Sequence, residues 1–144
     1  MHKGSCLCGV VTYEISGDIP DYGYCHCQSC RKASGTAYGA NIGIPRSQLD
    51  LHDPNNTLKA YESSPGKFRV FCGECGSPIY AYLSASEDLV RIRLGSLDTP
   101  LNKHVKAHTF ISDKADWELL EDRVPKFEKW ADKSVLVQLG SRQS

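Results

Sequence analysis

Apolar and polar residues alternate over short stretches along most of the chain, and turn residues separate these stretches. Val11, Tyr13 and Ile15 recur at a period of two, which is typical of a strand with one buried face. The same pattern predicts strands at residues 10–15, 37–44, 49–52, 58–62, 67–72, 78–83, 89–94 and 105–111. Short strands at close, regular spacing with turn residues between them predict a mainly β fold of small antiparallel sheets.

Helix signals are few. Residues 29–34 and 115–121 could each form a turn of helix, with Asp113 or Asp116 as the cap of the second. Residues 134–139 are apolar enough for either a strand or a short helix. We therefore expect one domain, residues 1–130, followed by a C-terminal segment, residues 131–144, whose structure the pattern leaves open.

Composition and charge exclude several classes of protein. The chain has 144 residues, of which 40% are hydrophobic and 24% charged, as in a single globular domain. Seventeen basic residues balance 17 acidic ones, which disfavours a nucleic-acid partner or a polybasic membrane surface. No stretch approaches the ~20 apolar residues of a membrane span, and we see no apolar leader. We expect a cytoplasmic protein whose thiols stay reduced.

The seven cysteines fall in three clusters. They are Cys6 and Cys8; Cys25, Cys27 and Cys30; Cys72 and Cys75. The odd number leaves one cysteine over in any scheme of disulfides alone. The spacing favours metal binding instead.

The first and third clusters together predict a closed four-cysteine zinc site. The Cys72-Gly-Glu-Cys75-Gly segment can present two thiolates to one ion from a tight turn, and Cys6-Leu-Cys8-Gly can supply two more. A site with four protein ligands has no open position and is structural. The alternative, that these cysteines are small buried hydrophobes, explains the paired spacings less well.

The second cluster supplies three thiols, the number of protein ligands that a catalytic zinc usually has. Three thiolates would leave the ion with about one net negative charge, which suits activation of a substrate thiol better than generation of hydroxide. Three alternatives remain: a structural zinc with His26 as the fourth ligand, an iron–sulfur site, or a redox C-x-x-C motif. His26 lies between two of these ligands and should face away from both in an extended segment.

Charged residues near these motifs are candidates for substrate binding. Arg31 and Lys32 directly follow the second cluster and could hold an anionic substrate. Arg91 and Arg93 share one face of a predicted strand and could grip carboxylates if that strand borders the site, although ordinary surface charge explains them as well.

Histidine and aromatic residues in the second half of the chain have less specific surroundings. His104 and His108 lie in or beside a predicted strand, so their spacing makes no helical metal face, although His108 could reach a site across the sheet. Trp117, Phe127 and Trp130 are predicted to lie in the core or to cover it.

The joint motif pattern is specific enough to indicate a family. Gly4-Ser5-Cys6-Leu7-Cys8-Gly9, Cys25-His26-Cys27-Gln28-Ser29-Cys30-Arg31-Lys32 and Phe71-Cys72-Gly73-Glu74-Cys75-Gly76-Ser77 follow one another in the chain. The sequence resembles the glutathione-dependent formaldehyde-activating enzyme family, which also contains the centromere protein V domain, over roughly residues 3 to 127.

The resemblance implies a β-tent fold, with small antiparallel sheets folded around zinc. It implies a structural zinc at Cys6, Cys8, Cys72 and Cys75 and a catalytic zinc at Cys25, Cys27 and Cys30. It also implies a carbon–sulfur lyase activity, in which glutathione adds to formaldehyde to give S-hydroxymethylglutathione.

We therefore expect a zinc-dependent enzyme that adds a small thiol such as glutathione to formaldehyde or a related electrophilic carbon, with His26 or His108 as general acid. The alternative is a zinc-stabilised binding module, similar to centromere protein V, without catalysis. A third hypothesis is a metal-handling or thiol-sensing protein. The expected partner is a small-molecule thiol, with no nucleic acid and no membrane.

Overall fold

A computed structural model describes residues 1–140 and shows a mainly β protein with two sheets and two short α-helices in that range. The strands are β1 (His2–Ser5), β2 (Thr12–Ile15), β3 (Gly23–Cys25), β4 (Gly39–Pro45), β5 (Leu49–His52), β6 (Leu58–Ser64), β7 (Lys67–Cys72), β8 (Pro78–Leu83), β9 (Leu89–Arg93) and β10 (Ala107–Thr109). The helices are α1 (Gln28–Ser34) and α2 (Lys133–Gln138). Single 3₁₀ turns at Arg46–Gln48, Ser84–Ser86, Leu94–Ser96 and Ile111–Asp113 join some of these elements.

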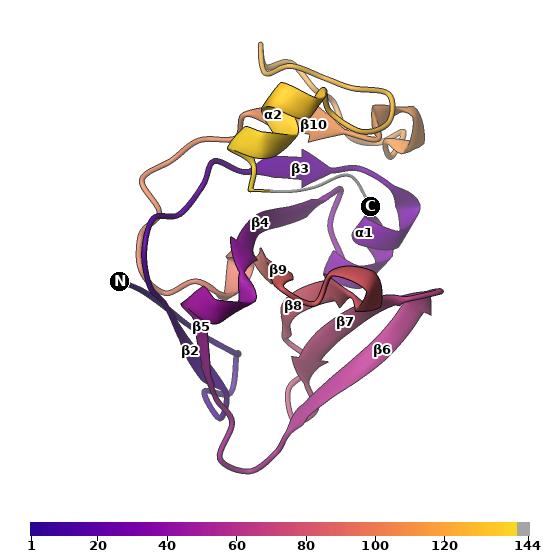
Figure 1. Ribbon diagram of the computed structural model, residues 1–144. Helices are drawn as coiled ribbons and strands as arrows, with labels where there is room; N and C mark the ends of the chain where they lie inside the picture. The colour runs from indigo at the N-terminus through magenta and orange to yellow at the C-terminus, as the bar shows by residue number, and fades with distance from the viewer. Residues whose placement is uncertain (141–144) are drawn as a thin grey trace.

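The larger sheet has seven strands in the order β10-β3-β4-β9-β8-β7-β6, and the smaller sheet has the order β1-β2-β5. All neighbouring strands run antiparallel except β10 and β3, which are parallel. In Figure 1, β2 and β5 lie on one side of the molecule and β6, β7 and β8 on the other, with β3, β10 and α2 at the top. The core fills the space between the two sheets.

Alternation along the strands decides which side chains enter this core. On β9, Val90 and Ile92 are buried while Arg91 and Arg93 lie on the opposite face. On β2, Tyr13 and Ile15 are buried, and they join Val11 in the same cluster. Fully removing an aliphatic side chain from water stabilises the fold by about 1.5–3 kcal/mol, so this face holds the sheets together.

The second face of the large sheet is covered by the C-terminal part of the chain. Leu139 follows α2, and its backbone oxygen accepts a hydrogen bond from the Gly43 amide of β4 at 3.4 Å. A Cβ atom at Gly23 of β3 would lie only 3.2 Å from the Leu139 side chain. The absence of a side chain at Gly23 therefore lets the segment around α2 lie close to the sheet.

The strand pattern predicted from the sequence is largely confirmed. Three predicted strands have the same bounds in the structure, namely β5, β7 and β8. The strands β1 and β3 were not predicted, because four and three residues are too few to show a period of two against glycine and cysteine.

The C-terminal third departs further from expectation. The predicted helical turn at residues 115–121 is wrong: this stretch is irregular, and Trp117 is 67% exposed rather than in the core. Residues 134–139 are helical in most of their length, as part of α2, and the last four residues of the segment 131–144 lie outside the described range. The longest helix in residues 1–140 has seven residues, and none of the helices described there could cross a bilayer.

The buried face of β9 gives a first prediction. Ile92 is 0% exposed, so Ile92→Ala should lower the free energy of unfolding by about 2–5 kcal/mol through lost burial and a residual cavity. Val137, 70% exposed on α2, is the matched control, and Val137→Ala should change stability by less than about 0.5 kcal/mol. Urea unfolding measures both values; similar losses for the two variants would contradict the placement of the core.

Candidate metal centres and the adjoining cavity

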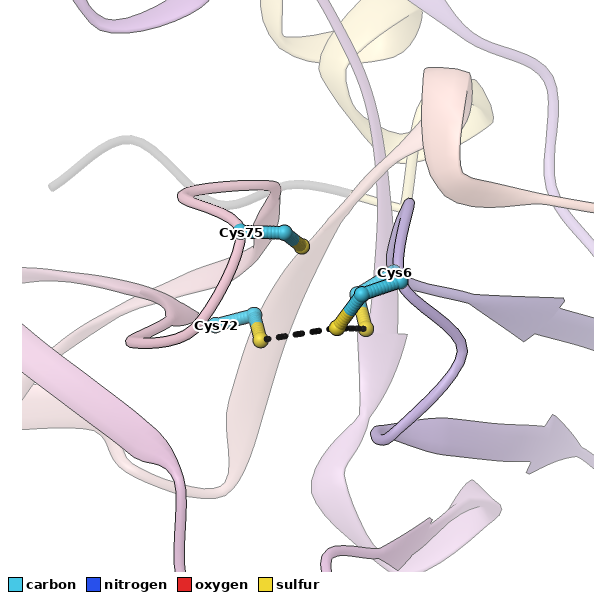
Figure 2. A group of neighbouring side chains, drawn as sticks. Cys6, Cys72 and Cys75 are labelled. Atoms are coloured by element: carbon cyan, nitrogen blue, oxygen red, sulfur yellow. Dashed lines mark hydrogen bonds between the residues drawn. The ribbon is translucent and has the colours of Figure 1, made fainter.

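Four cysteines from two distant parts of the chain converge between the sheets. Cys6 and Cys8 follow β1, Cys72 ends β7 and Cys75 lies in the turn before β8. Figure 2 shows Cys72 and Cys75 extending from this turn toward Cys6 on the facing loop. Their sulfur atoms all lie within 4.8 Å of one another. The predicted grouping of the first and third clusters is therefore present in the structure.

The two loops have closely similar local geometry. Gly9 and Gly76, each the residue after a cysteine, adopt φ values of +80° and +78°, which a side-chain-bearing residue rarely adopts. The Gly9 amide donates to the Cys6 carbonyl at 3.1 Å, and the Gly76 amide donates to the Cys72 carbonyl at 2.8 Å. Each glycine thus closes a tight turn that keeps its cysteine sulfurs on one side of the loop.

The sulfur spacing fits a tetrahedral metal ion. A bond length of about 2.3 Å to each sulfur places the sulfurs of such a site roughly 3.8 Å apart. The Sγ–Sγ distances are 3.6 Å for Cys6 and Cys8 and 3.9 Å for Cys8 and Cys72. Hydrogen bonds from the Ser77 side chain and backbone lower the pKa of Cys75 to about 5, which favours the thiolate that a metal requires. These four residues could hold one ion.

The second cluster lies where β3 passes into α1. Cys25 ends β3, Cys27 is the N-cap of α1, and Cys30 lies in its first turn. The Cys27 sulfur accepts a hydrogen bond from the Cys30 amide at 3.4 Å, so the residue that caps the helix is also a candidate ligand. The three sulfurs lie within 4.8 Å of one another. These cysteines could hold a second ion.

The thiols of this cluster do not share negative charge equally. Hydrogen bonds from Cys25 and Cys27, with smaller contributions from the cations Lys67 and Arg93, lower the pKa of Cys30. The neighbouring sulfurs of Cys27 and Cys30, together with burial, raise the pKa of Cys25. Without a cation, three adjacent thiolates repel one another, and a bound divalent ion removes that repulsion.

His26 points away from the three sulfurs, as its position between alternate residues predicts. It is fully buried and is not a member of either metal-binding group found among residues 1–140. Its Nε2 atom lies 2.8 Å from Nδ1 of His108 on the neighbouring strand β10. The hypothesis that His26 is a fourth ligand of the second cluster is therefore wrong in this geometry.

The two histidines continue into a hydrogen-bonded chain that reaches the surface. His108 Nε2 lies 2.9 Å from Asp122 Oδ2, and Lys126 Nζ lies 3.0 Å from the other oxygen of the same carboxylate. A carboxylate only accepts, so His108 donates from Nε2. Burial, followed by the charge of His108, lowers the pKa of His26 to about 4. The chain ties the metal-binding loop to a segment more than 90 residues later in the sequence.

A small cavity of about 80 Å³ adjoins the second cluster. Cys25 and Cys30 line it, and so do three basic residues of the sheet and three apolar residues of the C-terminal part. The basic residues are Lys67, Arg91 and Arg93, and the apolar ones are Trp130, Leu136 and Leu139. Strand β9 thus borders the site, which is the condition under which Arg91 and Arg93 were expected to matter. Arg31 and Lys32, on α1, are not among the lining residues.

A larger cleft of about 670 Å³ lies on another side of α1. Ala33 and Ser34 at the end of α1 line it, together with Tyr38, Asp98 and the backbone around Cys6. Arg93 lines both this cleft and the small cavity. The larger space is within the roughly 300–1,000 Å³ of sites for drug-sized ligands, and the smaller one is far below it.

Sequence reasoning missed two residues near the site. Lys67 begins β7, where it resembles any lysine after a turn, and Asp122 lies in a stretch with no periodic pattern. No local signal marks either residue. Lys67 reaches the site only through the order of strands in the large sheet, and Asp122 only because the chain comes back to β10 late in the sequence. Of the aromatic residues predicted as core or lid, Trp130 lines the small cavity. His104 is exposed.

Comparisons with known proteins agree with the motif pattern. Residues 1–113 match the family model described as glutathione-dependent formaldehyde-activating enzyme. A Schizosaccharomyces pombe protein named as an uncharacterized lyase is 28% identical over 79 residues, which are 55% of this chain. The chain thus spans 56% of that relative's length. A crystal structure of a Rhodobacter sphaeroides protein has the same fold, with a TM-score of 0.58 at 20% identity, over 69% of this chain and 91% of that one.

The histidine chain gives a second prediction, on local stability. Hydrogen bonds from Lys126 and His108 lower the pKa of Asp122 to about 2 from a usual value of 3.8. A carboxyl group with a lowered pKa in the folded state stabilises it above pH 4, and this contribution disappears as the pH falls from about 4 to 2. Asp122→Asn should therefore weaken the hydrogen-exchange protection of the Phe127 amide, which donates to the His108 carbonyl at 2.8 Å.

The difference in protection between wild type and Asp122→Asn should be present at pH 6 and shrink as the pH approaches 2. Asp116→Asn, at an exposed position, is the control and should leave protection unchanged. Equal protection in wild type and Asp122→Asn at pH 6 would show that Asp122 does not hold the segment.

Proposed function

Because the chain belongs to the glutathione-dependent formaldehyde-activating enzyme family, we propose that it is a carbon–sulfur lyase-type enzyme. Its substrates would be a small thiol, with glutathione as the first candidate, and formaldehyde or a related electrophilic carbon. Zinc would occupy both cysteine groups, with a structural ion at Cys6, Cys8, Cys72 and Cys75. The ion at Cys25, Cys27 and Cys30 would be catalytic.

The division of seven cysteines into four and three carries this proposal. Four sulfurs satisfy a tetrahedral ion, whereas three leave one position for a substrate atom. Cys25 and Cys30 also line the cavity of about 80 Å³, so an electrophile bound there would lie directly beside the second centre. A thiol and a carbonyl carbon can thus be held next to each other, which is the main requirement of an addition reaction.

A zinc ion held by the second cluster would bind the substrate thiol as a thiolate near neutral pH. In the overall reaction the sulfur forms a bond to the carbonyl carbon, the C–O double bond becomes a single bond, and the thiol proton ends on the oxygen. Negative charge develops on that oxygen before it is protonated. Lys67 and Arg93 line the cavity and can donate hydrogen bonds to it, which stabilises the transition state more than the ground state.

His26 and His108 would act as positioning residues in this reaction. Their facing nitrogens are 2.8 Å apart, and neither ring lines the small cavity. They connect the backbone between Cys25 and Cys27 to β10 and Asp122. This arrangement would keep the three thiolates at fixed spacing, rather than deliver the proton that we first expected from one of these histidines.

The larger cleft is our candidate for the thiol substrate. Its volume suits a tripeptide. Arg31 and Lys32 are not among its lining residues, but they directly precede Ala33 and Ser34 of α1, which are. We propose that these two cations contact the carboxylates of glutathione there. Arg31 is half-buried, and its Nε is buried with no hydrogen-bond partner among the described residues.

The decisive experiment measures rate rather than equilibrium, because thiols add to aldehydes without a catalyst. Exchange spectroscopy by NMR on glutathione and formaldehyde near equilibrium should show faster interconversion with the zinc-loaded protein than with the buffer or the metal-free protein. No acceleration with any small thiol and aldehyde would favour a binding module without catalysis.

The two metal groups should respond differently to loss of one ligand. Cys72→Ser should lower the melting temperature strongly, because a structural zinc contributes directly to folding free energy. Cys27→Ser should leave a folded protein with one zinc instead of two and no activity. Serine is a good N-cap, so this variant keeps the helix cap of α1 while removing the metal ligand.

Thermal melts and elemental analysis of both variants test this division. Wild type should contain two zinc ions per chain. Equal destabilisation by both substitutions would contradict separate structural and catalytic roles, and iron in place of zinc would contradict the proposed chemistry.

Loss of Arg31, the cation that directly follows the second cluster, should weaken binding of the thiol substrate and leave metal binding unchanged. Arg31→Ala should weaken glutathione binding about tenfold, as expected when a charged hydrogen bond is lost, with zinc content unchanged. Calorimetric titration compares it with Lys133→Ala, at an exposed position of α2. Equal glutathione affinities for all three proteins would show that Arg31 is an ordinary surface charge.

A further inference from the structure

The second face of the large sheet is unusually rich in positive charge. Directly paired residues of antiparallel strands share a face, and so do residues two apart on one strand. Arg69 and Arg91 both pair with Ala81, and Lys67 lies two residues before Arg69 on β7. Arg93 lies two residues after Arg91, so four cations from β7 and β9 lie on this one face.

The same face leads to the three-cysteine centre. Arg93 pairs with Asn41 on β4 and donates a hydrogen bond to its side-chain oxygen. Gly39, two residues before Asn41, pairs with Cys25 on β3. A Cβ atom at Gly39 would lie 3.2 Å from the Cys30 side chain and 3.6 Å from Arg93 Nη1. Glycine at this position therefore lets the guanidinium and the sulfur ligands lie close together.

Three of the four cations, namely Lys67, Arg69 and Arg93, are partly buried without matching carboxylates. Among the described residues, no ion pair involves Lys67, Arg69 or Arg93. Burial lowers the pKa of Lys67 and of Arg93, and the neighbouring cations lower both further, while the Cys30 thiolate acts in the opposite direction. Arg69 Nη1 is buried with no hydrogen-bond partner. Buried charges are ordinarily paired, so this arrangement calls for an anion.

The metal centre does not supply enough negative charge. Three thiolates around a divalent ion carry about one net negative charge, whereas Lys67 and Arg93, which line the cavity, carry two positive charges between them. Trp130, Leu136 and Leu139 add apolar surface to the cavity wall, and attraction to an anion beside such a wall is stronger than in bulk water. Neutral formaldehyde would leave the surplus positive charge unbalanced.

The cavity volume limits what the anion can be. About 80 Å³ is far below the roughly 300–1,000 Å³ of sites for drug-sized ligands. A tripeptide thiol does not fit, but a carboxylate attached to one or two further carbon atoms does. Because Cys25 and Cys30 form part of the wall, the rest of such a molecule would lie against the sulfur cluster.

We propose that the cavity bounded by Lys67, Arg93 and Asn41 is a carboxylate-binding subsite, and that the electrophile of this enzyme is a small 2-oxo acid. This rests on the proposed function, since it names the class of carbon that the thiol would attack. With such a substrate Arg93 and Lys67 hold the carboxylate, in place of the role on the carbonyl oxygen that they would have with formaldehyde. The adjacent carbonyl carbon is directed toward the cysteine centre. The thiol sulfur then bonds to that carbon, and its proton ends on the former carbonyl oxygen.

Two aldehydes of equal heavy-atom count test the subsite. Glyoxylate carries a carboxylate, and methylglyoxal carries a neutral methyl ketone in its place. Calorimetry on the zinc-loaded protein, without thiol, should show glyoxylate binding at least tenfold more tightly than methylglyoxal. Raising the chloride concentration should weaken only the glyoxylate affinity.

Variants of the cavity show whether the cations or the metal ion bind the carboxylate of glyoxylate. Lys67→Met and Arg93→Gln should each weaken glyoxylate binding tenfold or more, while both keep two zinc ions. Lys106→Gln, at an exposed position outside the cavity, should bind as wild type does. Neither cavity variant should have a lower melting temperature than wild type without ligand, since each removes a buried charge that lacks a carboxylate partner.

Each outcome supports or overturns the subsite. Unchanged glyoxylate affinity in both variants would place the carboxylate on the metal and overturn it. If both variants weaken glutathione binding but not glyoxylate binding, the carboxylate belongs to the thiol and the 2-oxo acid is wrong. Glyoxylate binding through these cations without any accelerated thiol addition would leave the subsite standing and overturn the proposed function instead. Turnover of formaldehyde with no binding of glyoxylate would leave the proposed function standing and overturn the subsite.

Discussion

The convergence of Cys6, Cys8, Cys72 and Cys75 is the constraint on which the rest of the structure depends. The first two follow a strand of the small sheet, and the last two lie where β7 turns into β8 at the far side of the large sheet. A single ion held by these sulfurs would therefore join both sheets across the core. The backbone brings the four sulfurs within 4.8 Å of one another, and two of the sulfur pairs are 3.6 and 3.9 Å apart. Metal binding there would thus be coupled directly to the packing of the two sheets.

With the sheets held in this way, the two faces of the large sheet acquire different roles. Ile42, Ile44, Val90 and Ile92 fill the core on one face. The other face carries basic side chains among glycine and alanine, whose small size leaves room for a cavity and for the chain that covers it. Strand order then places Cys25 only two strands from Arg93, although the two residues are far apart in sequence. The chemistry of the site arises from this proximity.

The part of the chain after residue 113 completes the site in two separate ways. Asp122 ends the hydrogen-bonded chain that begins at His26, between two candidate metal ligands. Trp130, Leu136 and Leu139 line the cavity beside Cys25 and Cys30. These residues lie beyond the 113 that match the family model. The family region therefore supplies the cysteines and the cations, and the remainder of the chain supplies the cover.

Local patterns were sufficient for much of the description. The cysteine spacings, which indicate ligand number, predicted both metal groups, and alternation predicted β5, β7 and β8 with their observed bounds. Such features depend on neighbouring residues alone. Lys67 and Asp122 could not be found in this way, and the importance of Arg93 could not be decided. Charged side chains such as these acquire their partners only when distant parts of the chain come together. Burial without a counter-charge is a property of the folded sheet, and no stretch of sequence displays it.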